Sequence, residues 1–334
     1  MRVRVARSRS ESISWELPER RVRSKRSHPL DKKSSHCFEY NHAMNEQYTL
    51  AEIQRMPMER LLLNSKKRCE QLAENQRDIE RNTYGTQEFI YGAYLGGVHS
   101  YFSDMPTRQA QSFHELADPR LIRADKEARE ARGEQPALGD WFGPGFIGYD
   151  LGFKRIFSAD LIAHDSAAPT DSETADLGPD KPLHTHFSTH SMINISYQQR
   201  VFTQVRIAKQ QEGLTLQTCF LRPFAGLLPY VDEPYAYVSI AHLLAGTYNA
   251  LDSGGEMFVE LTYLDARFLE TWERLIREAG INIERKPDTH VFKITKASAD
   301  SSMPDLQSLI ASHPEFAAFF EEFSRNLLEK KVVS

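Results

Sequence analysis

The sequence predicts an α/β protein: a doubly wound, mostly parallel sheet with an antiparallel last strand, preceded by N-terminal helices. Two observations in the segment 234–297 carry this prediction. Short apolar runs alternate there with helical patterns, which is the order expected for parallel strands joined by helical crossovers. Two further runs of alternating apolar and polar residues flank a turn at the end of the segment, which predicts a closing hairpin.

The individual elements of this segment follow from local patterns. The helix at 265–279 has apolar residues at spacings of three and four and ends at Gly280, a residue typical of helix C-termini. We expect strands at Tyr235–Ile240 and Met257–Leu261, a helix at Ala241–Leu251 between them, a turn at Asp252–Gly255, and hairpin strands at Ile281–Glu284 and His290–Ile294.

The rest of the chain is mainly helical at both ends. We expect helices at Thr49–Asn82 with a break at Pro57, Gln87–Phe102, Thr107–Arg132 with a break at Asp118–Pro119, Ser196–Gln211, Asp305–Ala311 and Pro314–Leu328, and strands at Leu183–His190 and Leu214–Leu221. The second half of the helix 107–132 is almost all charged or alanine and is expected to face water. The last helix carries a Phe-rich face, which predicts docking on the sheet or on the N-terminal helices; a homodimer contact is the alternative.

The segment 234–297 resembles the C-terminal half of a class I S-adenosylmethionine-dependent methyltransferase. The resemblance rests on the turn Leu251-Asp252-Ser253-Gly254-Gly255, on Glu278-Ala279-Gly280 at the end of a helix, and on the closing hairpin. It implies a Rossmann-like methyltransferase fold and S-adenosylmethionine as cofactor. On this basis we divide the chain into a disordered basic tail (1–43), a helical N-terminal or lid region (44–135), the Rossmann-like domain (136–298) and C-terminal helices (299–334).

Composition narrows the classes of function. The 334 residues are 40% hydrophobic and 26% charged, with three cysteines and no apolar run near the roughly 20 residues that span a bilayer. Residues 1–43 hold 11 Lys or Arg against 5 Asp or Glu, so a basic tail precedes an acidic body. We therefore expect a cytoplasmic protein that binds neither membranes nor nucleic acid. Either the tail is functional, or it is inert and translation begins at Met44.

The stretch 138–148 is the glycine-rich loop of the chain. Gly143 and Gly145 would let the backbone approach a cofactor at the start of a helix. Asp165, twenty positions later at an expected strand end, has the spacing of a ribose-binding carboxylate. By resemblance these are the methyltransferase glycine loop and ribose acid, although Gly139 stands where the family has an acid and Trp141 where it has a glycine. A turn that only packs a strand on a helix is the alternative, and Tyr149–Gly152 is a competing register.

Further site residues come from the same reasoning. Phe220 could stack on adenine, where the resemblance implies an adenine pocket, or lie in the core. His242, placed just after the expected strand 235–240, is a candidate general base. Tyr94 and His99, on the expected aromatic helix 87–102, are the other candidate general bases. That helix either covers a small-molecule pocket or packs on the main domain.

A metal site is a separate possibility. His184, His186 and His190 would share one face of a strand, and three imidazoles can bind one metal ion. Exposed strand histidines are the simpler interpretation, and we assign no metal.

These observations lead to one main hypothesis and two alternatives. The main hypothesis is methyl transfer from S-adenosylmethionine to a small-molecule acceptor. The alternatives are a decayed methyltransferase fold that serves as a binding module, favoured by Trp141 and Arg222, and a metal-dependent enzyme that uses the three histidines.

Overall fold

The computed structural model describes residues 48–84, 107–143, 145–159, 182–187, 192–221 and 230–333. Residues 48–334 cluster as one compact unit. The first half contains α2 (Leu50–Arg55), α3 (Met58–Tyr84), α6 (Thr107–Leu116), α7 (Pro119–Ala131), β1 (Gln135–Trp141), α8 (Phe146–Asp150), β2 (Arg155–Ala159) and β3 (Leu183–Phe187). The second half contains α9 (Ile195–Glu212), β4 (Leu214–Leu221), α11 (Pro234–Ala250), β5 (Glu256–Glu260), α12 (Ala266–Glu278), β6 (Asn282–Arg285), β7 (Val291–Thr295), α13 (Leu306–Ser312) and α14 (Pro314–Val333).

The described strands form one seven-stranded sheet in the order β3-β2-β1-β4-β5-β7-β6. The pairs from β3 to β5 are parallel, whereas β7 runs antiparallel to both β5 and β6. This confirms the predicted fold class. Strand order reverses between β1 and β4, and in open sheets of this kind ligands bind outside the carboxyl ends of the strands at such a point.

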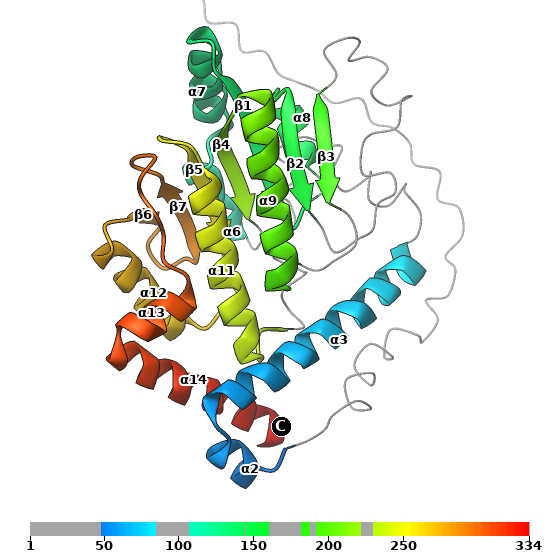
Figure 1. Ribbon diagram of the computed structural model, residues 1–334, viewed down its shortest axis with the longest axis vertical. Helices are drawn as coiled ribbons and strands as arrows, with labels where there is room; N and C mark the ends of the chain where they lie inside the picture. Colours follow the sequence, from blue (N-terminus) through cyan, green and yellow to red (C-terminus); the bar gives the residue numbers. More distant parts are fainter. Residues whose placement is uncertain are drawn as a thin grey trace, which may run out of the picture. The chain divides into compact units, whose positions relative to one another are not determined.

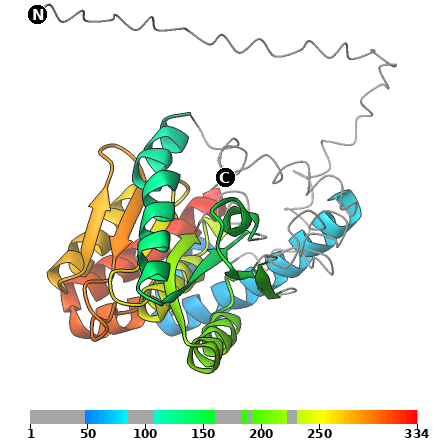
Figure 2. The same ribbon diagram turned by 90° about the horizontal axis from the view of Figure 1, so that it is seen from above.

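Helices cover both faces of the sheet (Figures 1 and 2). One apolar cluster joins one face of the sheet to α9, α11, α12 and α14, and a smaller one joins the other face to α6, α7 and α8. Successive residues of β1 therefore face the two clusters in turn: Gly139 and Trp141 face the first cluster, whereas Leu138 belongs to the second. The sheet is thus buried on both faces, as the run of buried residues along β1 requires.

The predicted strand at Tyr235–Ile240 is wrong, because these residues form the start of α11. The helix begins at Pro234, a residue suited to the first turn, and 13 of its residues are buried, so that apolar side chains lie on every side of it. Gly246 allows the closest approach, because a Cβ there would lie 2.3 Å from the Phe202 ring of α9. The strand that precedes α11 in the sheet is β4, which was predicted separately at 214–221.

Most other element predictions are confirmed. The break at Pro57 separates α2 from α3, Pro119 begins α7 after the break from α6, and both strands of the hairpin form. The Phe-rich face of α14 was expected to dock on the sheet or on the N-terminal helices, but it packs on α11 and α12: the Phe323 ring lies 4.9 Å from Tyr237 and 5.6 Å from Phe268 between ring centroids. The prediction that the second half of 107–132 faces water is wrong in part, since Ile122, Lys126 and Arg129 of α7 are buried.

Candidate functional site

A tight loop follows β1 at the point where the strand order reverses. Asp140, the penultimate residue of β1, is fully buried, and the Gly145 N–H donates to its Oδ2 over 2.9 Å. The Gly145 backbone has φ +85° and directly precedes α8. A carboxylate on the strand therefore holds the loop that opens the helix.

Both glycines of the loop are required by close contacts. A Cβ on Gly143 would lie 2.3 Å from Asp140 Oδ2, a distance that no real side chain tolerates. A Cβ on Gly145 would lie 2.6 Å from His184 Nε2, and the positive φ angle disfavours a side chain there in any case. Of the predicted cofactor-binding residues, Gly143 and Gly145 are thus brought together in one turn.

The loop is also tied to β2. The Phe142 N–H donates to the Ala159 carbonyl over 2.8 Å, and Gly143 forms a bridge to the same residue. Phe142 has φ +72°, which is uncommon for a residue with a side chain and costs on the order of 1–3 kcal/mol. Such local strain persists only where the surroundings fix the backbone, and it clusters at ligand-binding sites.

Gly139 and Trp141, the two residues that depart from the methyltransferase pattern, lie in close contact with each other. Gly139 has no Cβ, and one placed there would lie 2.8 Å from Trp141 Cζ2 and 2.9 Å from Cys219 Sγ. Trp141 is fully buried, with its ring edge-on to Phe202 of α9 at 5.9 Å between centroids. The indole therefore fills the core below α9. Asp140, one position after Gly139, supplies the buried acid of this loop.

A row of polar side chains borders the loop on the side of β2 and β3. Ser158 Oγ lies 2.7 Å from His184 Nε2 and 2.7 Å from His186 Nδ1, and the Tyr149 hydroxyl lies 3.3 Å from His184 Nδ1. Burial, then the neighbouring His186 and Arg155, lower the pKa of His184 to about 3. Burial raises the pKa of Tyr149 to about 12, so both groups are neutral near pH 7.

These histidines do not form a metal centre with other described side chains. In the parts of the chain that the structure describes, no three His, Cys, Asp or Glu side chains are grouped so as to hold a metal ion. His184 and His186 share one face of β3 as predicted, but both contact Ser158. His190 lies outside the described residues.

His242 is placed differently from the expectation. It lies midway along α11 rather than after a strand, and its Nδ1 is 2.7 Å from Gln198 Oε1. The Gln198 amide donates to Met192 O and to Ser239, so its oxygen is left to accept from His242. Burial lowers the pKa of His242. The strand that motivated this candidate is absent, and its catalytic role stays a prediction.

The remaining predicted site residues divide into two groups. Phe220 is almost fully buried in β4, where its ring stacks at 5.5 Å on Phe258 and at 6.3 Å on Phe113, so it is part of the core. Tyr94, His99 and Asp165 lie outside the described residues, and so does the predicted aromatic helix. Their roles stay predictions.

The sequence reasoning missed a second buried acid at the same edge. Glu260 ends β5, two strands from Asp140, and its Oε1 accepts from the Thr262 N–H over 2.8 Å. Strand alternation places its side chain on the face of Phe258, which belongs to the cluster below α6. A buried acid at a strand end is the signal that could have identified both Glu260 and Asp140.

Helix α3 runs along the carboxyl edge of the sheet (Figure 1). Ser65 Oγ accepts from the Tyr235 N–H at the start of α11, over 2.9 Å. Asn194, the N-cap of α9, donates through Nδ2 to Glu70 Oε1 over 3.5 Å. Arg68 pairs with the buried Glu233, the N-cap of α11, at 2.6 Å. The helix thus lies over the first turns of α9 and α11.

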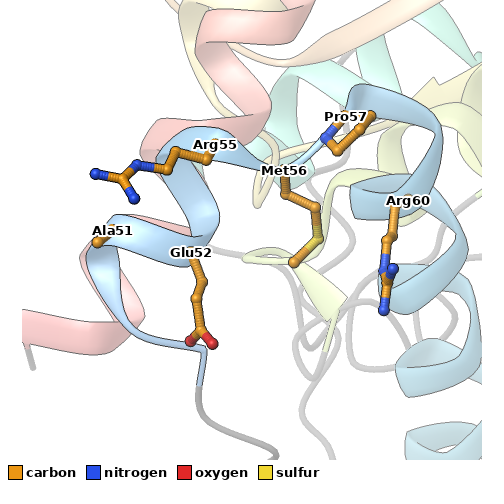
Figure 3. Close-up of a pocket in the computed structure, with 6 residues that line it drawn as sticks. All are labelled: Ala51, Glu52, Arg55, Met56, Pro57 and Arg60. Carbon is orange, nitrogen blue, oxygen red and sulfur yellow. The ribbon is translucent and has the colours of Figure 1, made fainter.

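A separate hollow of about 300 Å³ occurs at the junction of α2 and α3. It is lined by Ala51, Glu52, Arg55, Met56, Pro57 and Arg60 (Figure 3). Glu52, its acidic residue, is engaged by Thr49 in a capping box, and Arg55 points away from the other side chains. The functional site is therefore placed at the glycine loop instead.

Solved structures similar to this chain include methyltransferases. A magnesium protoporphyrin IX methyltransferase from Synechocystis PCC 6803 with bound S-adenosylmethionine is 12% identical, covers 67% of this chain and 97% of its own, with a TM-score of 0.36. A mycinamycin-pathway methyltransferase in complex with Mg and S-adenosylhomocysteine is 11% identical and covers 60% of this chain and 55% of its own, with a TM-score of 0.33. An O-methyltransferase family protein from Burkholderia thailandensis is 13% identical (68% and 72%, TM-score 0.30). No protein-family profile and no curated protein matches the chain.

The chain has the class I methyltransferase fold. The order and direction of its seven described strands define this fold. Among the described helices, none is both long enough and apolar enough to cross a membrane.

Proposed function

We propose that this protein transfers a methyl group from S-adenosylmethionine to a small-molecule acceptor. The observation that carries the proposal is the glycine loop after β1, which is anchored by the buried Asp140 and lies where the strand order reverses. Close contacts exclude a side chain at Gly143 and at Gly145. A loop that served only to connect β1 to α8 would not need two such glycines beside a buried carboxylate.

The chemistry of the site suits this cofactor. S-adenosylmethionine carries a sulfonium and an ammonium group, and the buried carboxylates Asp140 and Glu260 stand at the edge where it would bind. In their ionised form these acids would favour a cationic ligand, because charges interact more strongly away from bulk water.

The ribose acid is assigned anew. Asp165 is expected at a strand end, but residues 160–165 lie outside the described residues, and the described strand β2 spans Arg155–Ala159. Asp160 follows β2 directly in the sequence and lies fifteen positions after Gly145. Both aspartates lie outside the described residues, so the choice of Asp160 rests on sequence position. We propose it as the first candidate and retain Asp165 as the second.

When bound, the cofactor supplies the activated methyl group. The residues of this chain then have to orient the acceptor, exclude water and, for a protonated acceptor, take up a proton. His242, Tyr94 and His99 remain the proposed candidates for that base. The engagement of His242 Nδ1 by Gln198 would leave Nε2 as the atom that accepts the proton.

The alternatives receive no support from the described residues. Trp141 and Arg222 suggested a decayed binding module; Trp141 lies in the core against Phe202, and Arg222 lies outside the described residues. The metal-dependent alternative lacks a group of ligands in the described part of the chain. A cytoplasmic location, a homodimer and the absence of nucleic-acid binding stay predictions from the sequence.

The test is calorimetry with S-adenosylhomocysteine, the product form of the cofactor. We expect the wild type to bind it, and Asp160→Ala to weaken binding by at least about tenfold, since each factor of ten is about 1.4 kcal/mol, comparable with one hydrogen bond to a charged group. Asp165→Ala is measured beside it, and Asp300→Ala, in an exposed turn, is the control. Absence of heat from the wild type at high micromolar ligand would reject the proposal.

A further inference from the structure

Four polar side chains form a continuous chain of contacts beside the glycine loop. The order is Tyr149 of α8, His184 of β3, Ser158 of β2 and His186 of β3. Ser158 is fully buried, and the two imidazole rings lie 6.2 Å apart between centroids at 77°. These four side chains therefore connect α8, the helix that follows the loop, to the neighbouring strands β2 and β3 (Figure 1).

His184 touches the loop itself. Its Nε2 would lie 2.6 Å, and its Cε1 2.9 Å, from a Cβ built on Gly145, and Ser158 Cβ would lie 3.0 Å from the same point. On its other side Gly145 donates its N–H to Asp140. The Gly145 turn is thus held between a carboxylate of β1 and an imidazole of β3.

The hydrogen bonds among these four side chains can run in either of two directions. A neutral His184 carries one ring proton, and Ser158 has one hydroxyl proton to share between two imidazole nitrogens. If Ser158 donates to His184 Nε2, then His184 donates through Nδ1 to Tyr149, and Ser158 accepts from His186. The opposite order reverses every bond. In either order the rotamer of His184 is fixed from both ring nitrogens.

We propose that His184 and Ser158 are positioning residues that hold the Gly145 turn in the conformation that binds the cofactor. His186 and Tyr149 fix the orientation of His184 from the two ends of the chain. The inference rests on the proposed function. It gives the histidines of β3 a positioning role in place of metal binding or proton transfer.

The test compares two replacements of His184 in binding of S-adenosylhomocysteine by calorimetry. His184→Leu removes both hydrogen bonds, and we expect the dissociation constant to rise about tenfold or more. His184→Gln keeps a donor and an acceptor, and we expect it to restore affinity to within about threefold of the wild type. Thr185→Val, next to His184 on β3, is the matched control: it removes the hydrogen bond that Thr185 accepts from Arg155 of β2.

A spectroscopic measurement separates positioning from general stability. In protein with ¹⁵N-labelled histidine, the two ring nitrogens of His184 report which one carries the proton, and saturation with S-adenosylhomocysteine is expected to shift them. Ser158→Ala, a smaller change, is used if His184→Leu does not fold.

The outcomes distinguish the two proposals. A wild type that does not bind S-adenosylhomocysteine overturns the proposed function and this inference together. A wild type that binds, beside a His184→Leu or Ser158→Ala protein that is folded and binds equally well, overturns the inference alone. Equal losses in His184→Gln and His184→Leu would show that size and not hydrogen bonding matters, and would also overturn it.

Discussion

At the scale of single residues, the site is defined by groups whose ordinary behaviour is changed by burial. Asp140 is a carboxylate without solvent, and its Oδ2 accepts from the Gly145 N–H. His184 is an imidazole that burial keeps neutral. Both contact Gly145, so the conformation of this glycine depends on two buried side chains.

The lowered pKa of His184 predicts a pH dependence of stability. An unfolded histidine titrates at about pH 6.5, whereas His184 in the folded protein titrates at about 3. Between these values the unfolded chain takes up a proton that the folded chain does not, so the free energy of unfolding falls as the pH drops below about 6.5. The slope is at most roughly 1.4 kcal/mol per pH unit.

Denaturant unfolding of the wild type and of His184→Gln between pH 4 and 7 measures this effect. The variant should show a shallower decline towards low pH. His242 and His290, whose pKa values burial also lowers, contribute equally to both proteins and cancel in the difference. Parallel curves would contradict the prediction.

The contact between Gly143 and Asp140 predicts a selective loss of binding. Gly143→Ala places a Cβ 2.3 Å from Asp140 Oδ2, so the loop has to move while the buried strand β1 stays in place. We expect binding of S-adenosylhomocysteine to be lost in calorimetry, with the circular dichroism spectrum unchanged. Gly213→Ala is the control, because it strains a positive φ angle at the C-terminus of α9 and meets no neighbour. If both variants bind normally, the loop does not form the cofactor site.

At the scale of elements, α11 depends on another helix for the start of its first turn. Its N-cap residue, Glu233, makes no side-chain capping bond, and the Tyr235 N–H is satisfied instead by Ser65 of α3. Glu233 itself pairs with Arg68 and with Lys331 of α14, although burial outweighs these cations and raises its pKa. Helices far apart in the sequence thus meet at one helix N-terminus.

This dependence predicts the effect of Ser65→Ala. Removal of a capping hydroxyl costs about 1 kcal/mol, and the buried Tyr235 N–H would then lack that acceptor. We expect a loss of this size in the free energy of unfolding, measured with denaturant. Thr203→Ala removes an exposed hydroxyl that bonds within α9 and should change stability by less than about 0.5 kcal/mol. Equal effects would show that the contact between α3 and α11 is not stabilising.

The same helix shows why one element was mispredicted. The run Tyr235–Ile240 contains aromatic and β-branched residues, which favour strands. In α11 these residues are buried between α9, α3 and α14, so no polar face marks a helical period. By contrast α12 has one apolar and one charged face, and its bounds were predicted to within one residue.

At the scale of the whole molecule, the C-terminal helix closes the larger apolar cluster. Phe316, Phe320, Phe323 and Leu327 are buried, and they cover Tyr237 and Phe268. A chain that ends at Ser312 lacks α14 and would expose the rings of Tyr237 and Phe268. We therefore expect it to aggregate or to unfold without a cooperative transition.

Size-exclusion chromatography and thermal unfolding of the shortened chain check this prediction. A chain that lacks residues 1–43, the predicted basic tail, is the comparison and should unfold at the wild-type temperature. A cooperative transition at the wild-type temperature in the chain ending at Ser312 would contradict the assignment of α14 to the core.

The sequence alone determined the elements whose signal is local. The helical period of α12, the hairpin of β6 and β7 and the glycine loop at Gly143 and Gly145 could be predicted because spacing and backbone freedom act within a few residues. The tertiary structure decided what depends on distant neighbours: the helical state of α11, and the meeting of Asp140, Ser158 and His184 around Gly145. The parallel pairing of β1 with β2 and of β2 with β3 brings these groups together, and no local pattern encodes that pairing.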